Sequence, residues 1–149
     1  VRHRLKRRED REQVQTQRLA EKEAAMTPEE MKARTKAYAL RVIRVVQSLP
    51  PGRIGDVLGR QLLRAGTSVA ANYRAVCRAR SRADFVNKLR TVEEECDESL
   101  FWMELLVEGG LVRSSRLAEP MAEGNAILAI AVASAKTTRA ARPTVNRQS

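Results

Sequence analysis

The chain has 149 residues, a formal net charge of +10, 43% hydrophobic residues and only 3% aromatic residues. This length allows one domain with a core, and a core of Ala, Leu and Val rather than aromatic side chains favours closely packed helices. One histidine, two cysteines and no Cys-x-x-Cys motif are too few ligands for a metal site, so we expect neither a metal nor a cofactor.

The two ends of the chain carry most of the excess positive charge. Residues 1–25 have a net charge of +3, residues 26–135 also +3, and residues 136–149 +4. We expect residues 1–25 to be a charged extension, either disordered or a frayed helix, because their apolar residues are too sparse for a stripe. Residues 140–149 should be a disordered basic tail. The charged start lacks a secretory signal and no apolar run could span a bilayer, which predicts a cytoplasmic protein that does not bind a membrane.

The first firm helix is predicted to begin at the sequence "TPEE", residues 27–30. Thr27 can cap the helix, Pro28 suits its first position, and Glu30 completes a capping box. A stripe at alternating spacings of four and three then marks an amphipathic helix; its members are Met31, Thr35, Tyr38, Val42, Val45 and Leu49. The "LPPG" at residues 49–52 should end this helix.

Two further helices are predicted to form a hairpin. Asp56 is the expected cap of the first of them, which should end near residue 80. Its stripe is Leu58, Leu62, Ala65, Val69, Asn72 and Val76. The sequence "SRAD" is a capping box in its Asp form, so Ser81 should start the next helix, and Gly109-Gly110 should end it. The stripe of that helix is Phe85, Leu89, Val92, Cys96, Ser99 and Met103.

A fourth helix is expected to start near Ser114 or Ser115, although Pro120 and Gly124 weaken its first half. Four amphipathic helices with short connections and no strand signal predict an all-α fold. The predicted architecture is an up-down-up-down antiparallel four-helix bundle over residues 26–139.

Three polar residues lie on the predicted stripes: Ser68, Asn72 and Ser99. We interpret them as a structural polar core, in which a buried hydrogen-bonded pair fixes the register of the helices. A contact with a ligand is the alternative.

The carboxylates of "EEECDE", residues 93–98, are the candidates for acid–base chemistry. A small hydrolase using Glu94 or Glu98 would need one carboxylate desolvated in a cleft. An antiparallel hairpin that turns near residue 81 would instead place Arg64 opposite Glu98, and Arg60 opposite Glu104, as ion pairs. With no phosphate loop or nucleophile constellation in the sequence, we expect a protein that is not an enzyme and has no catalytic residues.

The same hairpin geometry gathers six cations at one end of the bundle: Arg74, Arg78, Arg80, Arg82, Lys88 and Arg90. Residues 74–90 have a net charge of +5, and residues 93–98 have −5. Arg78 and Arg80 can compensate a helix C-terminal dipole, but Arg82, Lys88 and Arg90 fall near a helix N-terminus, where positive charge is unfavourable. The cluster therefore predicts nucleic-acid binding directed at the phosphate backbone. An acidic protein surface as partner, or a role in solubility alone, remains an alternative.

The run "SLFWMELLV", residues 99–107, is apolar almost all the way round its helix. A helix of a lone bundle needs only one buried stripe, so the excess predicts an exposed interface for self-association. The predicted interface residues are Phe101, Trp102, Leu105 and Leu106.

Residues from about Met26 to Arg139 resemble the four-helix bundle family named after proteins encoded in intervening sequences of bacterial 23S rRNA genes. The resemblance rests on three motifs: Gln61 leading to Ser68 and Asn72, the basic turn from Arg78 to Phe85, and the helix with Ser99, Leu100 and Glu104. The chain departs from the family at Ala75-Val76, where many members have Glu-Gly.

The family is similar to the accessory variability protein of diversity-generating retroelements. That likeness implies a basic homopentamer that binds nucleic acid and a reverse transcriptase, and it implies no catalytic residues. From the residues and the resemblance together, the main hypothesis is a non-enzymatic, self-assembling bundle that binds RNA or DNA and could act as an accessory factor. The alternative is a protein–protein scaffold that docks an acidic partner.

Overall fold

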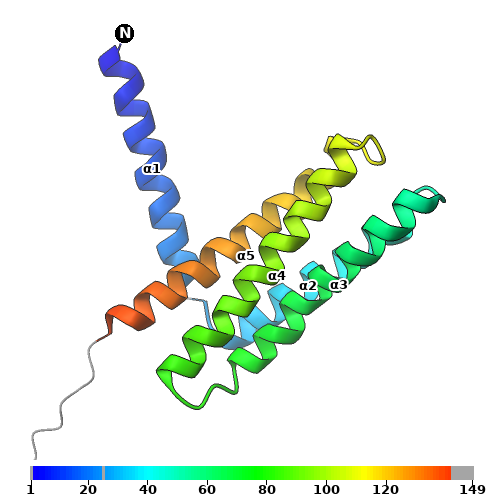
Figure 1. Ribbon diagram of the computed structural model, residues 1–149. Coiled ribbons are helices and arrows are strands. Elements are labelled where there is room, and N and C mark those ends of the chain that lie inside the picture. Colours follow the sequence, from blue (N-terminus) through cyan, green and yellow to red (C-terminus); the bar gives the residue numbers. More distant parts are fainter. Residues whose placement is uncertain (1, 25, 142–149) are drawn as a thin grey trace, which may run out of the picture.

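The computed structural model describes residues 2–24 and 26–141, and all the regular structure in these ranges is helical (Figure 1). The five helices are α1 (Arg2–Ala24), α2 (Pro28–Gln47), α3 (Arg53–Val76), α4 (Arg82–Glu108) and α5 (Ser114–Ala140). The all-α class predicted from the sequence is confirmed. The described residues contain five helices rather than four, because the extension, expected to be disordered or a frayed helix, contains helix α1. Of the tail predicted to be disordered, residues 140–149, Ala140 is the last residue of α5 and Ala141 is its cap, and residues 142–149 lie outside the described residues.

The start of α2 has the predicted capping box. The Thr27 side chain accepts a hydrogen bond from the Glu30 backbone N–H at 3.2 Å, and the Thr27 N–H donates to the Glu30 carboxylate at 3.0 Å. Two of the backbone donors that a helix start leaves without partners are thus satisfied. The helix ends at the Ser48 cap, just before the two prolines.

The α3 helix begins earlier and ends earlier than predicted. Gly52, at φ 153°, precedes its first residue, and Asp56 lies within the first turn instead of capping the helix. An acidic residue stabilises a helix from the first turn as well, through the helix dipole, so Asp56 alone does not fix the boundary. The helix ends at Val76, and its cap is Cys77.

The α4 helix has the predicted boundaries. The Ser81 side chain accepts a hydrogen bond from the Asp84 backbone N–H at 3.0 Å, and Gly109 is the C-terminal cap. The α5 helix begins at Ser114 and contains Pro120, which is buried within it.

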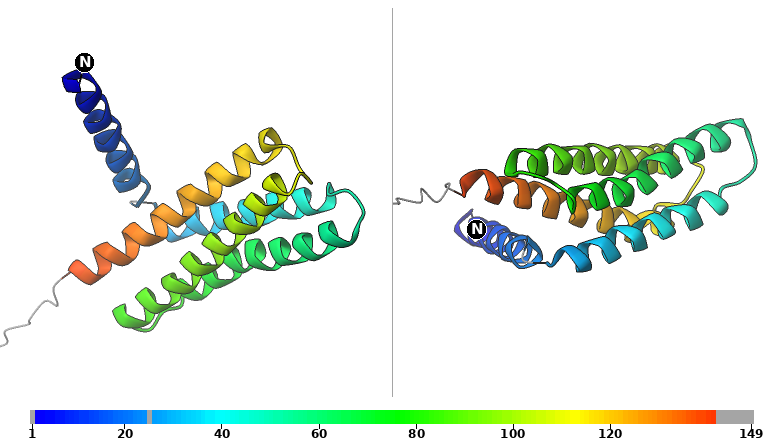
Figure 2. Two further views of the ribbon diagram at one scale, coloured as in Figure 1. Left: turned by 45° about the horizontal axis from the view of Figure 1, so that its top comes forward. Right: turned by 90° about the horizontal axis from the view of Figure 1, so that it is seen from below.

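Helices α2 to α5 pack as a bundle in which each helix contacts the next and α5 also contacts α2. Successive helices run in opposite directions, and α1 stands away from the bundle with its C-terminal part beside α5 (Figures 1 and 2). The start of α2, the α3–α4 connection and the last turns of α5 therefore lie at one end of the bundle. None of the helices among the described residues has an apolar run of the length that a bilayer requires.

The core forms where the predicted stripes meet. Most stripe residues are buried, including Tyr38, Leu62 and Leu89, which are at most 1% exposed. Each fully buried aliphatic side chain contributes about 1.5–3 kcal/mol to folding. Gly66 allows α3 to approach α2, because a Cβ atom there would lie 2.7 Å from the methyl groups of Val42.

Candidate nucleic-acid interface

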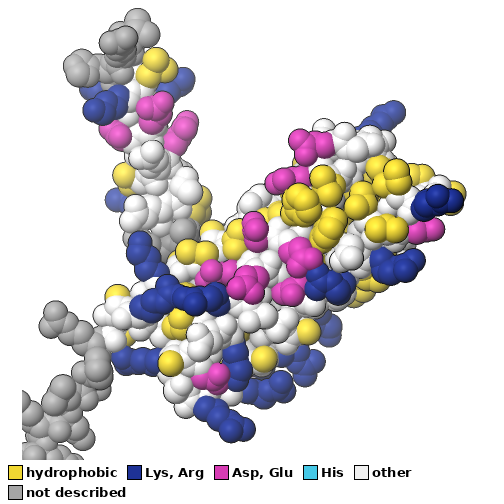
Figure 3. Space-filling model, in the orientation of Figure 1, with side chains coloured by type: hydrophobic (Ala, Val, Ile, Leu, Met, Phe, Trp, Pro, Cys, Tyr) yellow, Lys and Arg dark blue, Asp and Glu magenta, His cyan; other side chains and the backbone are white. Residues whose placement is uncertain are grey.

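The six predicted cations lie together at the end of the bundle formed by the last turn of α3, the α3–α4 connection and the first turns of α4. We call this region the basic end; its residues are Arg74, Arg78, Arg80, Arg82, Lys88 and Arg90. The five arginines are exposed and Lys88 is half-buried. Lys and Arg side chains also gather along the lower edge of the bundle in Figure 3.

The turn that carries the basic end is organised by Asp84. Its carboxylate accepts a hydrogen bond from the Arg80 backbone N–H at 3.0 Å and one from the Lys88 ammonium at 2.8 Å. The Lys88 hydrogen bond, followed by the Arg80 backbone bond, lowers the pKa of Asp84. Lys88 therefore has an anionic partner within α4, which makes it the weakest candidate of the six for a phosphate contact.

Arg82 also has a structural role. Its guanidinium donates a hydrogen bond to the backbone carbonyl of Ala141 at 2.7 Å, which ties the start of α4 to the end of α5. The sequence alone indicates no role in folding for Arg82, because the end of α5 is far from Arg82 along the chain.

Four arginines remain: Arg74, Arg78, Arg80 and Arg90. Within residues 2–24 and 26–141, the side chains of these four residues form no ion pair with a carboxylate. A guanidinium offers five donors in a planar fork that matches the geometry of a phosphate. The basic end therefore presents four cations whose charge no described carboxylate neutralises at short range.

The carboxylates lie in a separate band further along the α3–α4 hairpin (Figure 3). Arg64 pairs there with Glu98 and, at 3.3 Å, with Glu95, so the predicted Arg64–Glu98 pair is confirmed. Arg60 makes no ion pair with Glu104, although the structure describes both residues. The hydrogen bond from Arg64 lowers the pKa of Glu98, and Trp102 adds a bond at 3.2 Å.

The predicted polar core is only partly correct. Ser99 is fully buried; it shares a hydrogen bond of 2.7 Å with the Tyr38 hydroxyl and lies 2.7 Å from the Cys96 carbonyl, to which it can donate. Ser68 and Asn72 are half-buried, and the Asn72 amide donates to the Ser68 backbone carbonyl at 2.8 Å rather than to its side chain. The hydrogen-bond partner of Ser99 that was not predicted from the sequence is Tyr38. Its position on the buried stripe of α2 could have indicated this role, because a buried tyrosine hydroxyl needs a hydrogen-bond partner.

The predicted apolar interface needs a correction at Leu106. This residue is 0% exposed and belongs to the core, whereas Phe101 is 47% exposed and Trp102 and Leu105 are half-buried. Its periodicity explains the difference, because Leu106 lies three residues after Met103 on the buried stripe and continues it.

Two residues of α3 join the exposed apolar surface and were missed from sequence. Ile54 is 64% exposed and Val57 is 54% exposed. The Arg64–Glu98 pair sets the antiparallel register, which brings this part of α3 beside the end of α4. The apolar patch is thus formed by Ile54, Val57, Phe101, Trp102 and Leu105. Figure 3 shows hydrophobic side chains gathered at this end, at the upper right.

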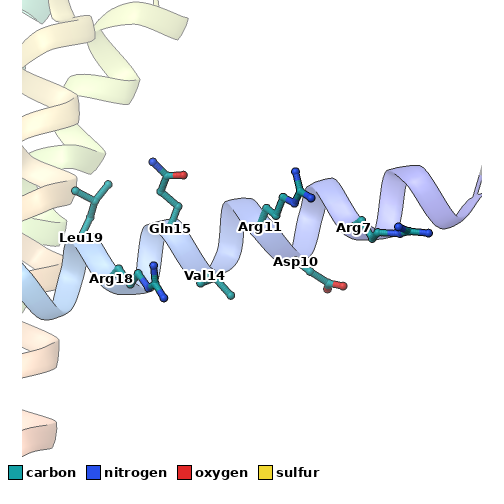
Figure 4. A pocket seen from close by; sticks show the side chains of 7 residues that line it. All are labelled: Arg7, Asp10, Arg11, Val14, Gln15, Arg18 and Leu19. Atoms are coloured by element: carbon teal, nitrogen blue, oxygen red, sulfur yellow. The ribbon is translucent and has the colours of Figure 1, made fainter.

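A hollow of about 680 Å³ follows helix α1, and its lining residues are Arg7, Asp10, Arg11, Val14, Gln15, Arg18 and Leu19. All seven come from one helix, and Figure 4 shows their side chains projecting to different sides of it. They enclose no site. The hollow at the basic end, of about 520 Å³, differs because α2, α3, α4 and α5 all contribute to its lining.

Comparisons with known proteins show which family the bundle resembles. The model of the family described as "23S rRNA-intervening sequence protein" matches residues 29–133. A crystal structure of a protein of unknown function from the S23 ribosomal protein family of Bacteroides thetaiotaomicron superposes with a TM-score of 0.69 and 29% sequence identity. The match covers 74% of this chain and 99% of that one. No curated protein matches. The chain therefore belongs to the 23S rRNA-intervening sequence protein family.

Proposed function

We propose that this protein is a non-enzymatic helical bundle that binds nucleic acid, RNA or DNA, through its basic end. The observation that carries the proposal is the group of four exposed arginines at one end of the bundle, Arg74, Arg78, Arg80 and Arg90, which have no carboxylate partner among the described residues. Phosphates of a nucleic-acid backbone are the polyanion that such a group suits, and contacts with phosphates carry no sequence information by themselves.

The separation of charges supports this proposal. The acidic band holds its own cation, Arg64, and Lys88 is held by Asp84. Asp84, the carboxylate of the α3–α4 turn, is thus already engaged, and the exposed arginines form no ion pair with it. The name of the family also supports RNA, because it refers to sequences within a ribosomal RNA gene.

Self-association forms the second part of the proposal. The apolar patch contains three large apolar side chains that are 47–64% exposed, Ile54, Val57 and Phe101, and such surfaces mark interfaces. A symmetric assembly of α2–α5 bundles, a homopentamer by family resemblance, would repeat the basic end in each copy and strengthen weak phosphate contacts. Cytoplasmic location, an accessory role and a reverse transcriptase as protein partner belong to the same proposal.

An enzymatic role for the acidic band has weaker support. An acid–base carboxylate near neutral pH needs a raised pKa, whereas Arg64 lowers the pKa of Glu98. Glu94, the other candidate, is exposed.

The test is nucleic-acid binding measured across a salt series with two matched variants. The variant Arg78→Gln/Arg80→Gln/Arg90→Gln removes three charges from the basic end, and the control Arg53→Gln/Arg113→Gln/Arg116→Gln removes three exposed charges from the opposite end. We expect the first variant to bind weakly and its salt slope to fall by about 3, roughly one for each arginine that no longer neutralises a phosphate. The control should bind almost as the unmodified protein does.

Equal binding by the two variants would contradict the proposal. Retention of an acidic protein partner by the control but not by the first variant, without any nucleic-acid binding, would instead favour the scaffold alternative.

A further inference from the structure

The hollow at the basic end combines an apolar interior with a cationic rim. Its interior residues are Tyr73 and Val76, which are 8% and 2% exposed, together with the half-buried Phe85. Exposed Arg80 and Arg82 stand at the rim. No carboxylate is among the described residues that line it.

We propose that this hollow receives one unpaired base of a single-stranded nucleic acid, with the phosphates on either side of that base held by the rim arginines. The inference rests on the proposed function and deepens it, because it names the kind of strand that the basic end binds. Phosphate contacts alone do not distinguish paired from unpaired strands, whereas a pocket for a base does.

Size and chemistry both suit this occupant. The hollow has a volume of about 520 Å³, inside the range of about 300–1,000 Å³ typical of small-ligand sites. Proteins bind unpaired strands by stacking bases on aromatic side chains within a positively charged groove. Two aromatic residues line the hollow, Tyr73 at the end of α3 and Phe85 at the start of α4. The half-buried Phe85 offers the more accessible ring, because Tyr73 is only 8% exposed.

Charge decides between a nucleotide and a purely apolar occupant. Arg80 is one of the four arginines without a carboxylate partner, and Arg82 uses one guanidinium nitrogen for the Ala141 carbonyl and has further donors. An apolar helix in the hollow would leave both cations without a counterion. A nucleotide supplies a flat apolar base for the interior and an anion for the rim.

The first experiment compares three 12-nucleotide RNA probes at one salt concentration: a single strand, the same strand in a duplex, and an abasic strand with the same phosphates. We expect the unmodified full chain to bind the single strand about tenfold more tightly than the abasic strand or the duplex, which is within the range measured for stacking of one base.

The second experiment fills the hollow without removing a cation. Ala79 lines it from the α3–α4 connection, so Ala79→Phe should block it, and the matched control Ala118→Phe places the same ring on an exposed position of α5. Phe85→Leu keeps apolar volume but removes an aromatic ring. We expect Ala79→Phe and Phe85→Leu to bind the single strand only as tightly as the abasic strand, and Ala118→Phe to keep the tenfold preference.

The failures are distinguishable. If the unmodified chain binds all three probes equally, the base pocket is wrong while phosphate binding stands. If it binds neither these probes nor the same three probes made of DNA, the proposed function also fails. A preference that survives both Ala79→Phe and Phe85→Leu overturns the pocket as its source.

Discussion

The Tyr38–Ser99 hydrogen bond is a polar contact that links two helices inside the core. Both side chains are 0% exposed, and they join α2 to α4 at 2.7 Å. Ser99 also lies within hydrogen-bonding distance of the Cys96 carbonyl, whereas no other hydrogen bond of the Tyr38 hydroxyl is seen among the described residues. Removal of the Ser99 hydroxyl therefore leaves Tyr38 without a partner among the described residues, whereas removal of the Tyr38 hydroxyl leaves Ser99 with one.

Ser99→Ala should destabilise the protein more than Tyr38→Phe does. The first change leaves a buried hydroxyl without a partner, at a cost of about 1–3 kcal/mol, whereas the second leaves Ser99 bonded to a carbonyl. The double variant should cost less than the sum of the two, as expected for partners in contact. Chemical denaturation of the four proteins measures this. A neutral Ser99→Ala would show that the pair contributes nothing.

Burial of the Cys96 thiol predicts a loss of stability in alkali. Burial raises the pKa of Cys96 from 9.0 to about 12, with a smaller contribution from Asp97. The folded state therefore keeps a proton that the unfolded state loses, so the contribution of Cys96 to the free energy of unfolding should be constant below about pH 9 and fall as the pH rises toward 12. The slope should approach about 1.4 kcal/mol per pH unit for one group.

Denaturation between pH 8 and 10 checks this expectation. Burial also raises the pKa of Tyr38, but a tyrosine in the unfolded state titrates only near pH 10, at the upper limit of this window. Cys96→Ala is the control and should show a flatter profile in this window. An equal slope in the variant would mean that another group is responsible.

At the scale of the helices, a helix cap depends on residues of its own helix, whereas the close approach of two helices depends on residues of both. The capping residues Thr27 and Ser81 act on their own helix starts, so the sequence could predict both. Gly66 is different. Its role comes from Val42 on another helix, and nothing in the sequence around Gly66 indicates that neighbour.

Gly66→Ala should destabilise the protein, contrary to the usual effect in a helix. Alanine improves helix propensity by about 1 kcal/mol, but its Cβ would lie 2.7 Å from both methyl groups of Val42, and overpacking of a core typically costs about 1–3 kcal/mol. Thermal or chemical denaturation measures the net loss. In a Val42→Ala background, Gly66→Ala should be less harmful or favourable; the same loss in both backgrounds would contradict the steric cause.

At the scale of the whole molecule, the α3–α4 hairpin has three regions along its length: the basic end, the acidic band around Glu98, and the apolar patch (Figure 3). The two outer regions lie at opposite ends of the bundle. An assembly that buries the apolar patches would therefore leave the basic ends accessible, which makes self-association and nucleic-acid binding compatible in one particle.

Ile54→Glu/Phe101→Glu should reduce the mass of the particle in solution. Two charges placed in a buried interface lack partners, so the assembly should dissociate while the bundle stays folded. Val132→Glu is the control, because Val132 is 46% exposed on α5, much as Phe101 is on α4. Light scattering with circular dichroism gives mass and fold together. A monomeric mass for the unmodified protein would refute the use of the patch for self-association.

The sequence by itself determined the all-α class, the positions of most helix ends and most of the core. These depend on the spacing of apolar residues and on caps within four residues of one another, which are local properties of the chain. It also determined that cations would collect near the α3–α4 connection, because a hairpin brings residues on either side of its turn together.

Only the tertiary structure decided what those residues contact. It assigned Leu106 to the core, joined Ser99 to Tyr38, tied Arg82 to Ala141, and assembled from four helices the hollow that holds Tyr73 and Phe85. Each of these contacts joins segments far apart in the chain. Their geometry depends on how the helices are rotated and spaced, which local periodicity does not fix.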